Sequence, residues 1–257
     1  IGYGRVSITP DYPVHLQGGD WRSRLTEDAR DDLYVTCVAI RNGAEPVLLY
    51  TLDLQSVRNS IGDTAKRVIS SATGVPEENI LLNATHTHSG VAIRYSWDGV
   101  DRYRMEFYQA AVKAAKDAIE ALSAATTYAG GTQTEKLTFV RHYTTNDGGV
   151  CGSNFGDHGS GYSGHAREAD QELQLVRFER EDKKDVLLMS FPAHATFLEM
   201  GNELSADYPG YARSYVEKNN EDMLVAFFQG ASGDQVPTSR IGSENFTKDC
   251  KISIKIH

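Results

Sequence analysis

Short apolar runs and longer segments with helical spacing alternate along this chain. The runs are partly β-branched or aromatic and are bounded by Gly, Pro or Asp, which is typical of buried strands. The four clearest runs cover residues 46–52, 79–82, 186–191 and 223–228. We therefore predict strands at these four places.

Three segments with helical periodicity lie among these runs. In residues 101–125 apolar side chains recur at steps of three and four, which places them on one face of a helix. Residues 63–72 are followed by Gly74, a residue type that favours the left-handed cap of a helix. Residues 208–218 follow Asp207, which is a suitable N-cap. We predict helices in all three segments.

This alternation predicts an α/β fold in which helices flank a mixed or largely parallel internal sheet, as a single domain over residues 1–257. Each predicted strand is followed by polar residues that can carry chemistry. In order along the chain these are Asp53, His86 with His88, His194, and Asp234. Sites in α/β proteins gather at the carboxyl ends of strands, so we expect these side chains to meet there.

Composition and charge narrow the classes of protein that fit. The net charge of −9 argues against a general nucleic-acid surface. No run approaches the ~18 apolar residues of a membrane span, and no secretory leader is visible, so we expect a soluble protein of undetermined compartment. The three cysteines lie far apart, in the pattern of neither a disulfide framework nor a thiolate metal site. Oligomeric state has no signature in the sequence.

The segment Thr85–Gly90, with the sequence THTHSG, is the strongest candidate for chemistry. In an extended chain residues i and i+2 face the same way, so both imidazoles can converge on one atom. Neutral imidazole is among the commonest metal ligands. A pair of surface histidines in a polar turn is the alternative.

A zinc site needs three or four N, O or S ligands, and a catalytic site keeps one position open for water. The best-placed nitrogen ligands are His86, His88 and His194. The carboxylates that can ligate or orient the imidazoles are Asp53, Asp207 and Asp234. A metal-bound water near pKa 7 attacks an amide or ester carbonyl, and a histidine that is not a ligand can act as general acid and base.

Each of these residues also has a purely structural interpretation. Asp207 is a possible helix cap, and Asp53 a possible loop cap after its strand. Gly233 and Asp234 suit a turn on conformational grounds. His194 is a possible interior histidine with no ligand.

Six motifs occur in a fixed order from Gly2 to about Pro237. They are Gly4–Pro10, Asp53–Leu54, Ala84–Gly90, Phe191–His194, Ser205–Gly210 and Phe228–Pro237. Together they resemble the catalytic domain of neutral/alkaline non-lysosomal ceramidases and their broader bacterial relatives. The resemblance implies a zinc-dependent amidase of sphingolipid metabolism, which splits the N-acyl bond of ceramide.

The resemblance also implies roles for individual residues. His86 and His194 match the zinc ligands, and Asp53 matches an aspartate near the metal, as ligand or in support. The residues implied for catalysis are His88, Arg141 and Asp234. The residues expected on the substrate side are Asp207, Ser232 and Gly233.

Three departures from the family pattern stand out. Val236 occupies the position of a serine that is implicated in catalysis, so ceramide itself is not the expected substrate. The glutamate and tyrosine that complete the family's zinc site lie downstream of the loop that contains Gly233 and Asp234 (the Gly-Asp loop) and have no counterpart before His257. We therefore expect a C-terminally incomplete catalytic domain. Val91 stands where ceramidases usually carry proline.

The leading hypothesis is a zinc-dependent hydrolase of an amide, or an ester, acting on a small-molecule or lipid substrate. A catalytically inactive member of the fold that binds a lipid or a glycan is the second hypothesis, because of Val236 and the missing ligands. A metallophosphoesterase is the third, and it requires a second metal about 3.5–4 Å from the first.

Overall fold

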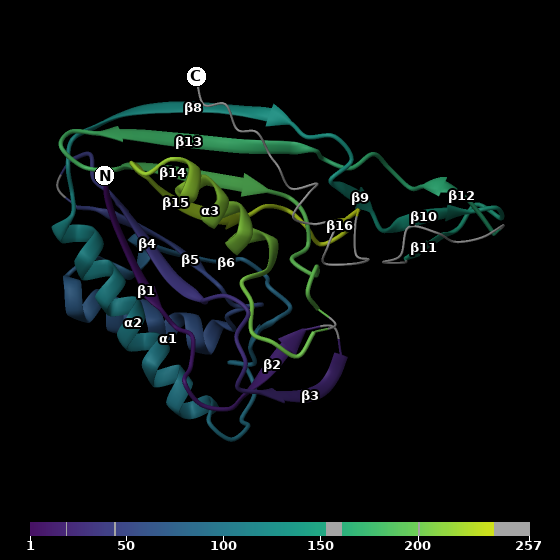
Figure 1. Ribbon diagram of the computed structural model, residues 1–257, viewed down its shortest axis with the longest axis horizontal. Helices are drawn as coiled ribbons and strands as arrows, with labels where there is room; N and C mark the ends of the chain where they lie inside the picture. The colour runs from purple at the N-terminus through teal and green to yellow at the C-terminus, as the bar shows by residue number, and fades with distance from the viewer. Residues whose placement is uncertain (19, 44, 153–160, 200, 239–257) are drawn as a thin grey trace.

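The computed structural model describes residues 1–18, 20–43, 45–152, 161–199 and 201–238 (Figure 1). Two four-stranded sheets, each with strands in both directions, form the centre of the fold. Helices lie on the outer face of each sheet. The architecture is therefore a helix–sheet–sheet–helix arrangement of the α/β type.

The first sheet has the strand order β1-β4-β5-β6. Its strands are β1 (Gly2–Ser7), β4 (Tyr34–Ile40), β5 (Val47–Leu52) and β6 (Ile80–Ala84). Only β5 and β6 pair in parallel, and the other two pairings are antiparallel.

Two helices cover this sheet, α1 (Asn59–Thr73) and α2 (Val100–Glu120). The predicted apolar stripe of α2 is buried, and it includes Tyr103 and Phe107. Helix α2 packs against β1 and β4, and α1 packs against α2. Gly74 ends α1 in the left-handed conformation, with φ of 78°, as its sequence position predicts.

The second sheet has the strand order β15-β14-β13-β8. Its strands are β8 (Ala125–Gln133), β13 (Glu172–Arg180), β14 (Asp185–Phe191) and β15 (Met223–Gln229). The pair β14 and β15 is parallel, and the other pairs are antiparallel. Helix α3 (Asp207–Asn219) packs against β15.

The alternation of side chains along β14 and β15 explains why two layers stack on this sheet. Leu187 and Phe227 belong to the apolar cluster that includes Val216 of α3. The neighbouring residues Val186 and Ala226 point the other way, into a cluster shared with the first sheet. The α/β class and the mixed pairing agree with the sequence prediction. The expectation of one internal sheet is corrected to two stacked sheets.

Smaller elements surround these layers. They are β2 (Val14–Gly18), β3 (Asp20–Thr26), η1 (Glu77–Asn79), β7 (Gly90–Val91), β9 (Thr138–Val140), β10 (His142–Thr145), β11 (Val150–Gly152), β12 (Tyr162–His165) and β16 (Gln235–Pro237). The three-stranded sheet β11-β10-β12 forms an arm that projects from the layered body (Figure 1).

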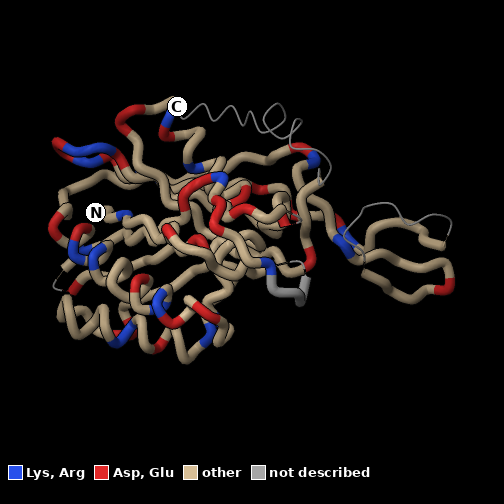
Figure 2. Tube along the Cα trace, turned by 60° about the horizontal axis from the view of Figure 1, so that its bottom comes forward, with Lys and Arg blue, Asp and Glu red and all other residues tan. Residues whose placement is uncertain are grey.

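Charged residues of both signs are distributed along the chain. Figure 2 shows Lys and Arg interspersed with Asp and Glu along the helices and loops. Among the helices of the described residues, none combines the length and the apolar character needed to cross a membrane.

Candidate metal and catalytic site

Three histidines from two distant segments of the chain meet beside the ends of β6 and β14. The centroid of the His86 ring lies 5.0 Å from that of His88 and 4.4 Å from that of His194. One ring nitrogen from each lies within 4.8 Å of the corresponding atom of the other two. Among the described residues this is the one group of three or more His, Cys, Asp or Glu side chains with the spacing of a metal site.

The backbone brings His86 and His88 together in an unexpected way. Strand β6 ends at Ala84, and His86 has a left-handed backbone with φ of 64°. A non-glycine residue in this region stores strain of about 1–3 kcal/mol, and such strain clusters at functional sites. The amide of His86 donates to the Leu54 carbonyl at 3.1 Å, which holds the turn in place. The two rings therefore converge through a turn, and the expectation of an extended segment is wrong.

Hydrogen bonds fix the tautomers of His86 and His194. Nδ1 of His86 lies 2.6 Å from the carbonyl oxygen of Gln55, and Nδ1 of His194 lies 2.8 Å from that of Ser232. A carbonyl oxygen only accepts, so each Nδ1 carries the proton and donates it. Each Nε2 therefore presents a lone pair, and the two Nε2 atoms lie 2.9 Å apart.

Burial keeps both rings uncharged. It lowers the pKa of His86, and it lowers the pKa of His194 to about 4. The nearby positive charge of Arg141 acts in the same direction on both rings. Two facing lone pairs at this distance repel each other unless a cation lies between them. The donor set thus fits a metal ion, with neutral imidazoles whose other nitrogens are held by carbonyl groups.

His88 completes the cluster and has two side-chain partners of its own. Its Nδ1 lies 3.3 Å from Oε1 of Glu199, and its Nε2 lies 3.2 Å from the side-chain nitrogen of Gln55. Glu199 is only 7% exposed, and a buried carboxylate needs a donor of this kind. His88 therefore donates from Nδ1 to Glu199, and its Nε2 faces the other two histidines, 3.5 Å from Nε2 of His86.

Sequence reasoning missed Glu199 and Gln55. Gln55 directly follows the strand-end motif that contains Asp53, and Glu199 is a single acid in the run Ala195–Met200. A single acidic residue in an otherwise uncharged run was the signal that could have indicated Glu199.

Asp207 and Asp53 have structural partners away from the histidines. Asp207 is fully buried and accepts from the amides of Leu198 and Tyr208 at 2.8 and 2.6 Å, so it shapes the loop that carries Glu199. Asp53 is 1% exposed, and its carboxylate pairs with Arg213 at 2.9 Å. Neither carboxylate contacts the histidine cluster in the described structure. The roles expected for them, Asp207 on the substrate side and Asp53 as ligand or support, stay predictions.

The Gly-Asp loop contributes its backbone to the site. The carbonyl oxygen of Ser232 accepts a hydrogen bond from Nδ1 of His194, and Arg141 donates from Nη2 to the carbonyl oxygen of Gly233 at 2.7 Å. The carboxylate of Asp234 points to Arg167, whose Nε lies 2.9 Å from it. The structure thus gives Asp234 an ion-pair partner, and its expected catalytic role stays a prediction.

Val236, the residue at the position of the family serine, is buried in β16. It is 2% exposed and pairs in register with Phe139 of β9. It therefore offers no polar atom to the site.

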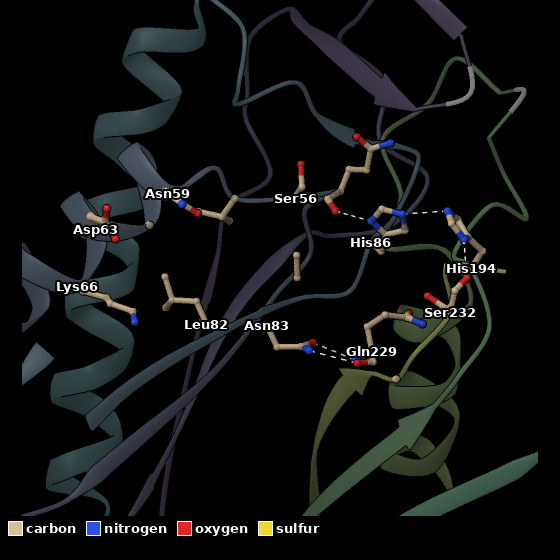
Figure 3. A pocket seen from close by; sticks show the side chains of 16 residues that line it. Ser56, Asn59, Asp63, Lys66, Leu82, Asn83, His86, His194, Gln229 and Ser232 are labelled. Carbon is tan, nitrogen blue, oxygen red and sulfur yellow. Dashed lines mark hydrogen bonds between the residues drawn. The ribbon is translucent and has the colours of Figure 1, made fainter. Parts of the chain in front are cut away.

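A cavity of about 570 Å³ begins at the histidines. Figure 3 shows that His86, His194 and Ser232 form one end of it and that α1 forms the other. Its volume lies within the range of about 300–1,000 Å³ that is typical of small-molecule sites.

The low pKa of His194 predicts a pH dependence of the metal-free protein. In the unfolded chain this histidine has a pKa near 6.5 and in the folded chain about 4, so the unfolded state binds more protons between these values. The stabilising contribution is therefore complete above pH 6.5 and is lost as the pH falls towards 4. Burial raises the pKa of Asp207 to about 7, which acts in the opposite direction, so the comparison must be made with a His194→Gln variant.

We expect the stability advantage of the wild type over His194→Gln to shrink by about 2 kcal/mol between pH 7 and pH 5. Urea unfolding at both pH values measures this change, and histidine NMR of the metal-free protein follows the ring directly. A His194 ring that titrates near pH 6.5 contradicts the assignment.

Comparisons with known proteins agree on one family. The sequence profile described as "Neutral/alkaline non-lysosomal ceramidase, N-terminal" matches residues 31–254. The structure is similar to that of neutral ceramidase from Pseudomonas aeruginosa, with a TM-score of 0.75 and 18% identity over 92% of this chain and 39% of that one. It is also similar to a structure named "Ceramidase complexed with C2", with a TM-score of 0.73 and 17% identity over 92% and 38% of the two chains.

At these identities the two structures show a shared fold, and this chain spans about two fifths of their length. No curated protein matches the sequence. The sequence profile covers most of the chain, and the fold is that of two ceramidases. The chain therefore belongs to the neutral/alkaline non-lysosomal ceramidase family.

Proposed function

We propose that this protein is a zinc-dependent hydrolase that cleaves an N-acyl amide bond, with the metal held by His86 and His194. One observation carries the proposal. The two uncharged rings turn their Nε2 lone pairs towards each other at 2.9 Å, while carbonyl groups hold both Nδ1 protons. Family membership supports hydrolysis as the reaction class.

When bound, zinc supplies a Lewis acid that polarises the scissile carbonyl and lowers the pKa of water. The chain's own residues orient the reactants and move the proton. His88 accepts at Nε2 a proton of the attacking water as the water oxygen bonds to the acyl carbon, and the carboxylate of Glu199 at its Nδ1 stabilises the cation that results. His88 then returns the proton to the leaving nitrogen as the carbon–nitrogen bond breaks.

The Gly-Asp loop and Arg141 border the site on the substrate side in this proposal. Arg141 brings a fixed positive charge close enough to lower the pKa of both His86 and His194. Such a charge stabilises the negative oxygen that develops when a carbonyl is attacked. Ser232 and Gly233 line the cavity next to the histidines. An ester satisfies the same geometry and is the secondary substrate class.

Replacing Glu199 should separate proton transfer from metal binding. In Glu199→Ala the Nδ1 proton of His88 loses its acceptor, so we expect kcat to fall by about 10²–10⁴-fold, the usual contribution of a positioned acid or base. Zinc content and KM should stay near wild type. Glu199→Gln keeps an acceptor oxygen and should retain more activity than Glu199→Ala.

The measurement is steady-state hydrolysis of a panel of N-acyl amides, including a short-chain ceramide, with zinc content determined on the same samples. Equal kcat in Glu199→Ala and the wild type contradicts the role of His88 and Glu199 in proton transfer. If the protein is instead a catalytically inactive binding protein, neither the wild type nor any variant hydrolyses the amides, and His86→Ala leaves the binding of the amides unchanged.

A further inference from the structure

The end of the cavity away from the histidines is lined by one face of α1. Asn59, Asp63 and Lys66 follow each other at steps of four and three residues, so they share a side of the helix. Figure 3 shows the three side chains at this end, with the Lys66 side chain extending towards Leu82. This face is a second set of polar groups in the same cavity, separate from the metal site.

The side chains on this face are not used by the fold. Within the described chain, Asn59, Asp63 and Lys66 have no side-chain hydrogen bond and no ion pair. By contrast, two other polar residues of the wall, Asn83 and Gln229, bridge β6 to β15, with the backbone amide of Gln229 donating to the side-chain oxygen of Asn83 at 2.9 Å. The α1 face therefore holds polar groups that are free to meet a ligand, among them two charged side chains.

Lys66 differs from its two neighbours in burial. Its side chain is partly buried in the wall, whereas Asn59 and Asp63 are exposed. The ammonium group is therefore the charge best placed to meet a ligand inside the cavity. Few apolar side chains line this space, and they are Val57, Leu82 and Ala84. Such a lining disfavours a long alkyl chain and favours a polar, negatively charged group.

We propose that this cavity binds N-acyl amides that carry a carboxylate on the amine side, as N-acyl amino acids do, and that Lys66 binds the carboxylate. The assignment of the amide to the histidine end rests on the proposed function, and the carboxylate site at Lys66 does not. The acyl carbonyl lies towards His86 and His194, and the carboxylate forms a charge-assisted hydrogen bond with the Lys66 ammonium group. Asp63, on the same face of α1, repels ligands with additional negative charge.

The test measures binding, so it does not depend on turnover. The probes are N-butyryl ω-amino acids with two to six carbons in the amino acid, each paired with its primary amide, which removes the charge and keeps the shape. Calorimetry gives Kd for each pair with the zinc-loaded protein. At the best chain length we expect the acid to bind about tenfold more tightly than the amide, corresponding to about 1.4 kcal/mol.

Two variants locate the effect. Lys66→Met should abolish the preference for the acid, whereas Arg67→Met should leave it unchanged. Arg67 is the adjacent residue of α1, is exposed and does not line the cavity. The proposal is overturned if acid and amide bind alike at every length, if neither binds, or if Lys66→Met keeps the preference.

The same probes separate this proposal from the proposed function. If the free carboxylic acids bind more tightly than their primary-amide partners but no N-acyl bond is hydrolysed, the Lys66 site is supported and the amidase is contradicted. If the N-acyl bond is hydrolysed in both members of each pair with equal KM, the Lys66 site is contradicted and the amidase is supported.

Discussion

Alanine in place of His86 or His194 is expected to reduce zinc from about one ion per chain to background. Each variant leaves one of the two imidazoles that we assign to the metal, whereas zinc sites in proteins usually have at least three protein ligands. Hydrolysis should fall with the metal, by about 10³-fold or more, because the electrophile is lost. Elemental analysis of purified protein measures the zinc, and circular dichroism verifies that the variants fold.

His142→Ala is the matched control for this experiment. His142 is exposed on β10 and is not part of the histidine group. It should keep both zinc and activity. Stoichiometric zinc in both His86→Ala and His194→Ala would remove the basis of the proposed function.

The largest effect on stability is expected from Arg213→Met. Arg213 of α3 and Asp53 after β5 form an ion pair in which the side chains are 3% and 1% exposed. Removing the arginine leaves Asp53 buried without its counter-charge, which costs about 3–5 kcal/mol in comparable pairs. Urea unfolding measures this loss.

Lys113→Met supplies the comparison for an exposed pair. Lys113 and Asp117 form an i,i+4 pair of 2.6 Å on α2, with side chains 64% and 37% exposed. The loss there should stay below about 1 kcal/mol. A double variant, Asp53→Asn with Arg213→Met, should recover part of the stability because it removes the unpaired charge. If Arg213→Met is as mild as Lys113→Met, the buried pair does not have the role assigned to it.

Local pattern explains which elements were predictable from the sequence. The four predicted strands correspond to β5, β6, β14 and β15, and the three predicted helices to α1, α2 and α3. In each of these the apolar residues lie close together in sequence. Strand β8 carries no such pattern, since all nine of its residues are exposed, so its pairing with β13 could not be predicted. The stacking of two sheets depends on such long-range pairings.

The candidate site was predictable where a residue type itself carries the chemistry. His86, His88 and His194 were chosen correctly as a group that meets in space. The carboxylates were harder, because a partner distant in sequence decides where each one points. Asp53 pairs with Arg213, 160 positions away, and Asp234 with Arg167, 67 positions away. Neither partner has a signal near the aspartate in the sequence.

An anomalous-scattering map at the zinc absorption edge, from crystals of the protein grown with zinc, locates a bound zinc ion directly. We predict one strong peak at the histidine cluster, about 2.0–2.1 Å from Nε2 of both His86 and His194. Two peaks about 3.5–4 Å apart would indicate a two-metal site of the phosphoesterase type. A map with no peak at these histidines would contradict the metal-dependent hydrolase.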